Sequence, residues 1–168
     1  LESEDPRFPT EGKTGKTPTN ANRVLGQFEV VVSELGHANV KSLTFGERMH
    51  SVSDPFEEAE RLYLNGSGLK HDLEQRHSRL QAQKEVRPLH IWDVGLGAAA
   101  NAMAALRAAE SLGVPLVMVS FENDLDALKI AHSHLDRFKY LDHPAIHDLL
   151  SKREYRSATT RWTLLEGD

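Results

Sequence analysis

A short glycine-containing turn has the residue types and spacing best suited to ligand binding. Gly95 and Gly97 are followed by Ala100, in the pattern glycine-x-glycine-x-x-alanine. Between a strand and a helix, the first glycine permits the tight bend and the second lets a ligand approach the backbone. The third small residue permits close packing of helix on strand. The amides that open such a helix are free and lie at the positive end of its dipole. The pattern therefore predicts a site for the polar part of a nucleotide-like ligand.

An acidic residue follows at the distance that a ribose ligand needs. Glu122 lies 22 residues beyond Ala100, close to the spacing of about 20 residues at which a carboxylate accepts hydrogen bonds from ribose hydroxyls. Asp124 is expected to cap the following helix instead. Asp168 comes after another apolar stretch, and an acid at that position is expected near an adenine ring.

Two polar side chains favour S-adenosylmethionine over a dinucleotide. Asp93 lies two residues before Gly95, where its carboxylate can face an ammonium group but would repel a pyrophosphate. Asn101 follows the turn and offers its amide to a carboxylate or a hydroxyl. We therefore expect S-adenosylmethionine as the cofactor. An NAD-dependent oxidoreductase is the alternative reading of the same turn.

The segments around the turn predict the elements that must position it. Residues 89–94 and 114–121 are apolar runs typical of buried strands, and residues 161–165 predict a third strand. Helical patterns cover residues 98–112 and 124–138. Strands that alternate with helices are typical of a parallel sheet with right-handed crossovers. The predicted fold class is therefore α/β, with a Rossmann-like sheet.

The first 88 residues are predicted to form a tail and an extension. Residues 1–22 are polar and rich in proline, which predicts a disordered tail. Residues 28–33 and 40–45 predict a β-hairpin. Asp54-Pro55 is a helix-start signal, and a polar second helix is expected over residues 69–84. The expected division is a tail (1–22), a hairpin and helical extension (23–88), and the first half of a Rossmann-like cofactor-binding domain (89–168).

Composition narrows the classes of function. The net charge is −5 and the isoelectric point about 6.0, so the chain lacks the basic surplus typical of nucleic-acid binders. The absence of cysteine excludes disulfides and thiolate chemistry. The nine histidines show no ligand spacing, so we expect no metal site. No apolar run is long enough to cross a bilayer, and no secretory signal is visible, so we expect a cytoplasmic protein with no membrane partner.

Several other conspicuous residues are expected to have structural roles. Trp92 and Trp162 lie in predicted strands and are expected in the core. His143 and His147 flank a proline and are expected in a loop. The basic residues at 152, 153 and 156 are expected in a solvated loop rather than in a tRNA-binding patch.

The sequence resembles the MnmC-type methyltransferase domain. The likeness rests on the glycine turn with Asn101, on Ser120-Phe121-Glu122, and on Leu165-Glu166-Gly167-Asp168. An upstream block, Gly46–Ser51 followed by Glu57–Leu64, resembles the hairpin end and first helix of that family. The likeness extends from residue 28 to residue 168.

The resemblance implies a class I methyltransferase fold and methyl transfer to an aminomethyl nitrogen on a tRNA wobble uridine, which makes tRNA an expected partner. It implies that Gly95, Gly97 and Asn101 line the methionine part of the cofactor. It also implies that Glu122 holds the ribose and that Asp168 lies near the adenine. Four further residues are expected to close over the cofactor: Met49, His50, Ser51 and Glu58.

This chain also departs from the family pattern. Ala98-Ala99-Ala100 stands where the family has Thr-Gly-Leu. The catalytic residues are expected beyond Asp168 and are unassigned here. A missing C-terminal half, or a flavin-dependent oxidoreductase as partner, is therefore expected to complete the enzyme. A non-catalytic remnant or partner module that keeps the fold is the second alternative.

Overall fold

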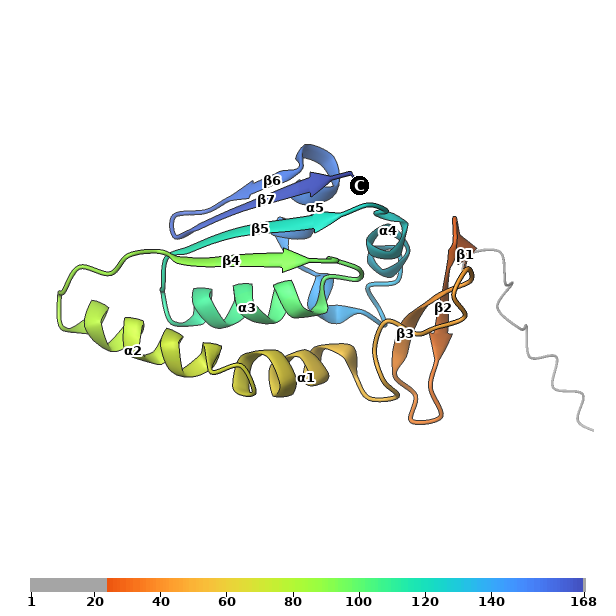
Figure 1. Ribbon diagram of the computed structural model, residues 1–168, viewed down its shortest axis with the longest axis horizontal. Coiled ribbons are helices and arrows are strands. Elements are labelled where there is room, and N and C mark those ends of the chain that lie inside the picture. The colour runs from red at the N-terminus through yellow and green to blue at the C-terminus, as the bar shows by residue number, and fades with distance from the viewer. Residues whose placement is uncertain (1–23, 168) are drawn as a thin grey trace, which may run out of the picture.

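Four strands form the main sheet of the computed structural model, which describes residues 24–167 (Figure 1). Their spatial order is β4-β5-β7-β6. The bounds are β4 (Leu89–Val94), β5 (Leu116–Glu122), β6 (Glu154–Arg156) and β7 (Thr160–Glu166). β4, β5 and β7 run parallel, which confirms the predicted α/β class and the Rossmann-like sheet. β6 was not predicted and pairs antiparallel with β7, so the sheet is mixed rather than purely parallel.

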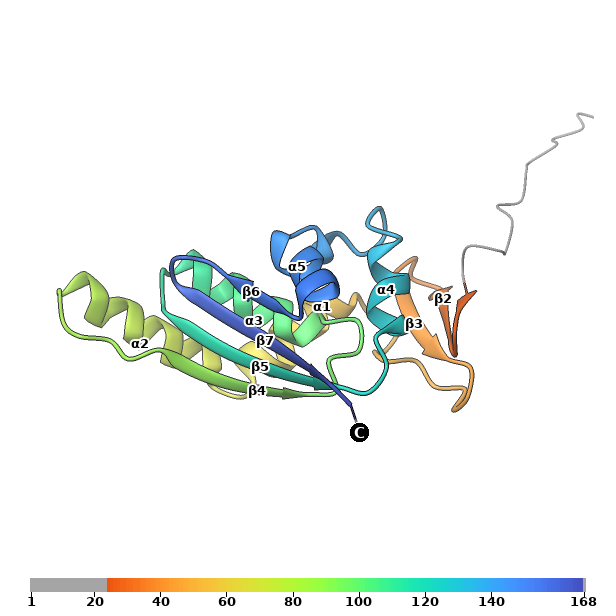
Figure 2. The ribbon, with the colours of Figure 1, turned by 90° about the horizontal axis from the view of Figure 1, so that it is seen from above.

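Helices cover one face of this sheet (Figures 1 and 2). α3 (Ala100–Ser111) connects β4 to β5. The connection from β5 to β6 contains α4 (Asp126–His132), the 3₁₀ turn η3 (Lys139–Leu141) and α5 (Pro144–Lys152). Met118 on β5 and Trp162 on β7, which are both 0% exposed, lie in the core between this sheet and the helices.

The opposite face of the sheet is open in the part of the chain that the structure describes. Trp92 and Val94 on β4 are 76% and 82% exposed, and Leu165 on β7 is 48% exposed. The expectation that Trp92 lies in the core is wrong, because successive side chains of a strand alternate between faces and Trp92 takes the uncovered one. The same expectation is confirmed for Trp162, which is buried.

A small antiparallel sheet precedes the main one. It contains β1 (Val24–Leu25), β2 (Phe28–Val32) and β3 (Ala38–Ser42). The predicted hairpin is confirmed, but its second strand begins two residues earlier and ends at Ser42, because the chain turns back over residues 43–46. The sheet packs against α4. The predicted tail, residues 1–22, lies outside the described residues.

Three helical segments join the two sheets. α1 (Pro55–Ala59) continues directly into a π-helical turn, η2 (Glu60–Asn65), and α2 (Leu69–Gln81) follows. Asp54 caps α1 as predicted, since its Oδ1 accepts hydrogen bonds from the amides of Phe56 (2.8 Å) and Glu57 (3.1 Å). These helices pack against α3, and one hydrophobic cluster runs through the small sheet, the helices and the main sheet.

Two predictions, one of where a helix ends and one of a loop, were wrong for local reasons. The helix expected over residues 124–138 ends at His132, because the side chains of Ser133 and His134 bond to the carbonyl of Ile130 (2.8 and 2.9 Å) and compete with the next turn. The loop expected around His143 and His147 is the start of α5. The ring Nδ1 of His143 accepts the amide of Ala145 (3.1 Å), and a proline stands at the first helical position.

Candidate functional site

The glycine turn lies at the carboxyl ends of β4 and β5, where α/β sheets bind ligands. Gly95 (φ +78°) and Gly97 (φ +53°) both have left-handed backbones that favour glycine. The amide of Gly95 donates to the carbonyl of Phe121 (2.9 Å), which fixes the turn against the end of β5. Ala99 is also left-handed (φ +59°), and α3 therefore begins at Ala100 rather than at the predicted residue 98. No side chain caps α3.

The carboxylate of Glu122 is held by three backbone amides. Its Oε2 accepts from Gly97 (2.7 Å), and its Oε1 accepts from Asn123 (2.9 Å) and Asp124 (3.2 Å). Glu122 therefore lies in the turn, as a ribose-binding acid must. It also occupies the amide of Gly97, which a pyrophosphate would otherwise use.

Asp93 lies at the end of β4 with its carboxylate partly buried. Its Oδ2 accepts a hydrogen bond from the hydroxyl of Ser120 (2.7 Å). Burial raises the pKa of Asp93, and the negative charge of Glu122 adds to the rise, while the hydrogen bond from Ser120 opposes it. Two carboxylates thus lie near the same turn, and a cationic ligand would relieve their repulsion.

Asn101, in the first turn of α3, has a buried side-chain oxygen without a hydrogen-bond partner. Together with Asp93 it lines a groove of about 270 Å³ along the free side of β4, and Tyr63, Leu69 and Ala105 complete its apolar walls. The groove is therefore lined by Asp93 and by Asn101, whose unpartnered oxygen is itself shielded from solvent. Both groups accept hydrogen bonds from a ligand that carries N–H donors.

Met49 extends from the small sheet to the glycine turn. Its amide donates to the carbonyl of Val40 (2.9 Å), so the segment continues alongside β3. A Cβ atom built on Gly97 would lie 3.2 Å from the sulfur of Met49. A side chain at position 97 would therefore have to displace this methionine.

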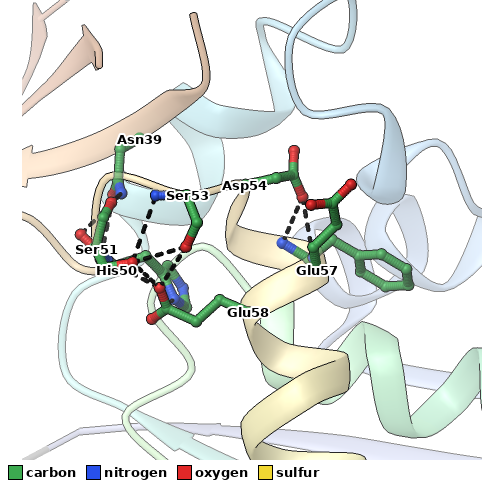
Figure 3. A network of polar contacts seen from close by, with 8 residues as sticks. Asn39, His50, Ser51, Ser53, Asp54, Glu57 and Glu58 are labelled. Carbon is green, nitrogen blue, oxygen red and sulfur yellow. Dashed lines mark hydrogen bonds and ion pairs between the residues drawn. The ribbon is translucent and has the colours of Figure 1, made fainter. Parts of the chain in front are cut away.

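The segment after Met49 is fixed to α1 by a polar network (Figure 3). The side-chain amide of Asn39 donates to the carbonyls of His50 (2.9 Å) and Ser51 (3.0 Å). The Oε2 of Glu58 accepts from the amide of Ser51 (3.2 Å) and the hydroxyl of Ser53 (2.9 Å), and also from the hydroxyl of Ser51. The network joins β3, the segment and α1 into one rigid unit.

His50 and Glu58 form a shielded pair inside this network. The Nδ1 of His50 lies 3.6 Å from the Oε1 of Glu58, and each side chain is 12% exposed. Burial lowers the pKa of His50 although the charge of Glu58 opposes it. Burial would raise the pKa of Glu58, but the hydrogen bonds from Ser51 and Ser53 and the nearby His50 hold this pKa below its ordinary value.

The sequence-predicted site residues fall into three groups. Asp93, Gly95, Gly97, Asn101 and Glu122 lie around the turn. Met49 contacts the turn, whereas His50, Ser51 and Glu58 bond to one another and hold the segment that Met49 belongs to. Asp168 lies outside the described residues.

Sequence reasoning missed two residues that hold the turn from a distance. The hydroxyl of Tyr140 donates to the carbonyl of Ala98 (2.9 Å), and burial raises the pKa of this tyrosine. The ring of Tyr140 stacks on Phe56 of α1 with the centroids 5.6 Å apart. Asn39 fixes the segment after Met49, because its side-chain amide donates to the carbonyl of His50. Neither residue carries a local motif, because both contacts join parts of the chain far apart in sequence.

The basic residues at 152–156 are paired with acids. Lys152 bonds to Asp148 (2.9 Å), Arg153 to Glu166 (2.6 Å) and Arg156 to Glu154 (2.7 Å). The solvated loop expected here is wrong, since Lys152 is the last residue of α5, Arg153 caps that helix, and Arg156 is the last residue of β6. Across residues 24–167, no group of three His, Asp or Glu side chains is arranged to hold a metal, and no helix is long and apolar enough to cross a membrane.

Comparison with solved structures gives a fold likeness to the crystal structure of MnmC2 from Aquifex aeolicus. The TM-score is 0.58 at 19% sequence identity, and the match covers 86% of this chain and 43% of that chain. This chain thus spans less than half the length of that protein. No protein-family profile matches the sequence, and no curated protein matches it.

Proposed function

We propose that the chain binds S-adenosylmethionine at the glycine turn and serves a methyltransferase. The observation that carries the proposal is the pair of carboxylates, Asp93 and Glu122, at one strand-to-helix turn. A pyrophosphate brings two negative charges to such a turn, where Asp93 would repel them and Glu122 already accepts the hydrogen bond from the amide of Gly97. S-adenosylmethionine instead has a positively charged sulfonium and an ammonium group. This charge pattern favours the methyl donor over NAD.

Each part of the proposed cofactor has a matching group in the chain. The free lone pairs of Glu122 would accept hydrogen bonds from the ribose hydroxyls. Asp93 and Asn101 would accept from the ammonium group of the cofactor. The N-terminus of α3, which no side chain caps, would offer its amides to the carboxylate of the cofactor. Met49 covers the turn. Asp168 is proposed to lie near the adenine.

The proposed reaction is methyl transfer to an aminomethyl nitrogen on a tRNA wobble uridine. When bound, S-adenosylmethionine supplies a methyl group on a positively charged sulfur. The role of this chain's residues is to fix that cofactor so that a neutral nitrogen can approach in line. The fold likeness to MnmC2 and the sequence resemblance to the MnmC-type domain support this substrate class. A cytoplasmic location belongs to the same proposal.

A second candidate is a cofactor-binding part that needs further polypeptide for catalysis. The open face of the sheet favours it, as does the match to only 43% of the neighbour's chain. No group among residues 24–167 is assigned here to keep the acceptor nitrogen unprotonated. A second half of the domain, or an oxidoreductase partner, would then supply it.

Two experiments separate these candidates. Calorimetric titration of the purified chain should detect one site for S-adenosylmethionine and none for NAD. Transfer of labelled methyl from the cofactor to tRNA that carries the aminomethyl uridine should follow if the chain is sufficient. Binding without transfer supports the second candidate, whereas binding of NAD alone would overturn the proposal.

A further inference from the structure

A line of hydrogen bonds crosses the main sheet beneath the candidate site. The indole Nε1 of Trp162 on β7 donates to the hydroxyl oxygen of Ser120 on β5 (2.9 Å). The hydroxyl of Ser120 donates to the Oδ2 of Asp93 on β4 (2.7 Å). Trp162 and Ser120 are both 0% exposed, so water does not compete for either bond.

The direction of this relay is fixed by the chemistry of its first member. An indole N–H donates hydrogen bonds and accepts none, so the oxygen of Ser120 must be the acceptor. A hydroxyl has one hydrogen, and in this arrangement it points to Asp93. The relay therefore presents a hydroxyl donor to Asp93, because the indole N–H occupies the acceptor side of the same oxygen.

We propose that Ser120 and Trp162 are positioning residues that orient the carboxylate of Asp93 for the cofactor's ammonium. The proposal rests on the proposed function. With Oδ2 occupied by Ser120, Oδ1 is the oxygen left for a ligand in the groove that Asp93 and Asn101 both line. These two acceptors suit a group with several N–H donors, as an ammonium has.

The same hydrogen bond from Ser120 also favours the ionised form of Asp93. Burial and the charge of Glu122 both raise the pKa of Asp93, and the bond from Ser120 is the contribution that lowers it. Without that bond, a larger share of Asp93 would be protonated under mildly acidic conditions. A protonated Asp93 loses the charge that attracts an ammonium.

The test uses Ser120→Ala and Trp162→Phe, with Ser33→Ala as the matched control for the loss of a buried hydroxyl. Ser33 is buried just after β2, so this control removes the same chemical group away from the relay. The first readout is the pKa of Asp93 in the ligand-free chain, from carboxyl carbon resonances. The second is the dissociation constant for S-adenosylmethionine between mildly acidic and neutral pH.

We expect Ser120→Ala to raise the pKa of Asp93 and to weaken S-adenosylmethionine binding by about tenfold, since a hydrogen bond to a charged group is lost. The loss should grow as the pH falls. Trp162→Phe should shift both readouts in the same direction by less. Ser120→Thr, which keeps the hydroxyl, should restore the wild-type pKa.

The two readouts separate the relay from the proposed function. An Asp93 pKa that is unchanged in Ser120→Ala would overturn the relay, whatever the cofactor does. If the pKa of Asp93 rises but the wild-type chain does not bind S-adenosylmethionine, the proposed function fails and the hydrogen-bond relay stands. If Ser120→Ala does not fold, Trp162→Phe provides the same two comparisons.

Discussion

Ala99 is the residue at which the glycine turn stores backbone strain. Its backbone is left-handed (φ +59°, ψ +19°), a conformation that favours glycine. A left-handed conformation costs an alanine about 1–2 kcal/mol, because its Cβ approaches the following carbonyl. The residue is buried, and its amide donates to the carbonyl of Leu96 (2.8 Å). Packing and this hydrogen bond together hold Ala99 in the left-handed conformation.

We expect Ala99→Gly to raise the free energy of unfolding by about 0.5–1 kcal/mol. The change relieves the left-handed strain but increases the backbone entropy of the unfolded chain, which offsets part of the gain. Denaturant unfolding measures the difference. Ala104→Gly, in the buried middle of α3, should lower the same free energy by about 1 kcal/mol or more. Equal losses in both variants would show that Ala99 is not strained.

At the residue scale, local patterns were predictable and long-range contacts were not. The left-handed turn at Gly95 and Gly97 and the place of Glu122 follow from residue types at fixed spacings. The contacts of Met49 with Gly97 and of Tyr140 with Ala98 join segments far apart in the sequence, so no local residue pattern predicts them. Trp92 was placed in the core because its strand is apolar, but burial depends on what covers each face.

At the scale of elements, the segment after β3 and helix α1 act as one unit through Glu58. Its carboxylate accepts from Ser51 and Ser53 and lies beside His50. These contacts hold the segment that places Met49 against the glycine turn. The position of Met49 therefore depends on a carboxylate that does not contact the turn.

Glu58→Gln should lower the free energy of unfolding by about 0.5–1.5 kcal/mol at neutral pH, because the donors of Ser51 and Ser53 lose a charged acceptor. Denaturant unfolding at several pH values provides the measurement. The pKa of Glu58 is depressed, so its stabilisation is present above an ordinary glutamate pKa of about 4.3 and is lost as the pH falls through the folded value. The acid limb of the stability curve should therefore flatten in the variant.

His50 contributes to the same acid limb. Its pKa is lowered by burial, so the unfolded chain takes up a proton first as the pH falls below about 6.5, and the free energy of unfolding declines from there.

Glu57→Gln is the matched control for Glu58→Gln, since Glu57 is the preceding residue of the helix and is exposed. A Glu57 variant with the same loss as the Glu58 variant would contradict the role of the network.

Element boundaries were predictable where a capping signal was present. Asp54-Pro55 gave the start of α1, and the strand over residues 89–94 was predicted with its correct bounds. The π-helical turn and β6 carry no such signal, because each depends on packing against distant elements. The start of α5 had a proline signal, but it was read as a loop.

At the scale of the whole molecule, as far as residues 24–167 describe it, the sheet has one face packed on helices and one face open. The open face includes Trp92, Val94 and Leu165, and β4 lies at the edge of the sheet. An exposed apolar face beside a free edge strand makes a protein prone to association. The two tryptophans lie on opposite faces and can report on each face separately.

Fluorescence quenching by acrylamide should distinguish the two faces. In Trp162→Phe the remaining Trp92 is expected to be quenched readily and to show emission typical of water. In Trp92→Phe the remaining Trp162 should resist quenching, because it is 0% exposed. Sedimentation at the same concentrations provides the control for self-association. A protected Trp92 in a monomeric chain would contradict the open face.

The central claim is that the glycine turn and Glu122 bind S-adenosylmethionine. Calorimetric titration of the wild-type chain and of Glu122→Ala tests it most directly, with Glu34→Ala, in the exposed hairpin turn, as the control. We expect one site in the wild type and in the control, and an affinity lower by about tenfold or more in Glu122→Ala, because the ribose hydroxyls lose a charged acceptor. No binding by the folded wild-type chain, or binding unaffected by Glu122→Ala, would contradict the claim.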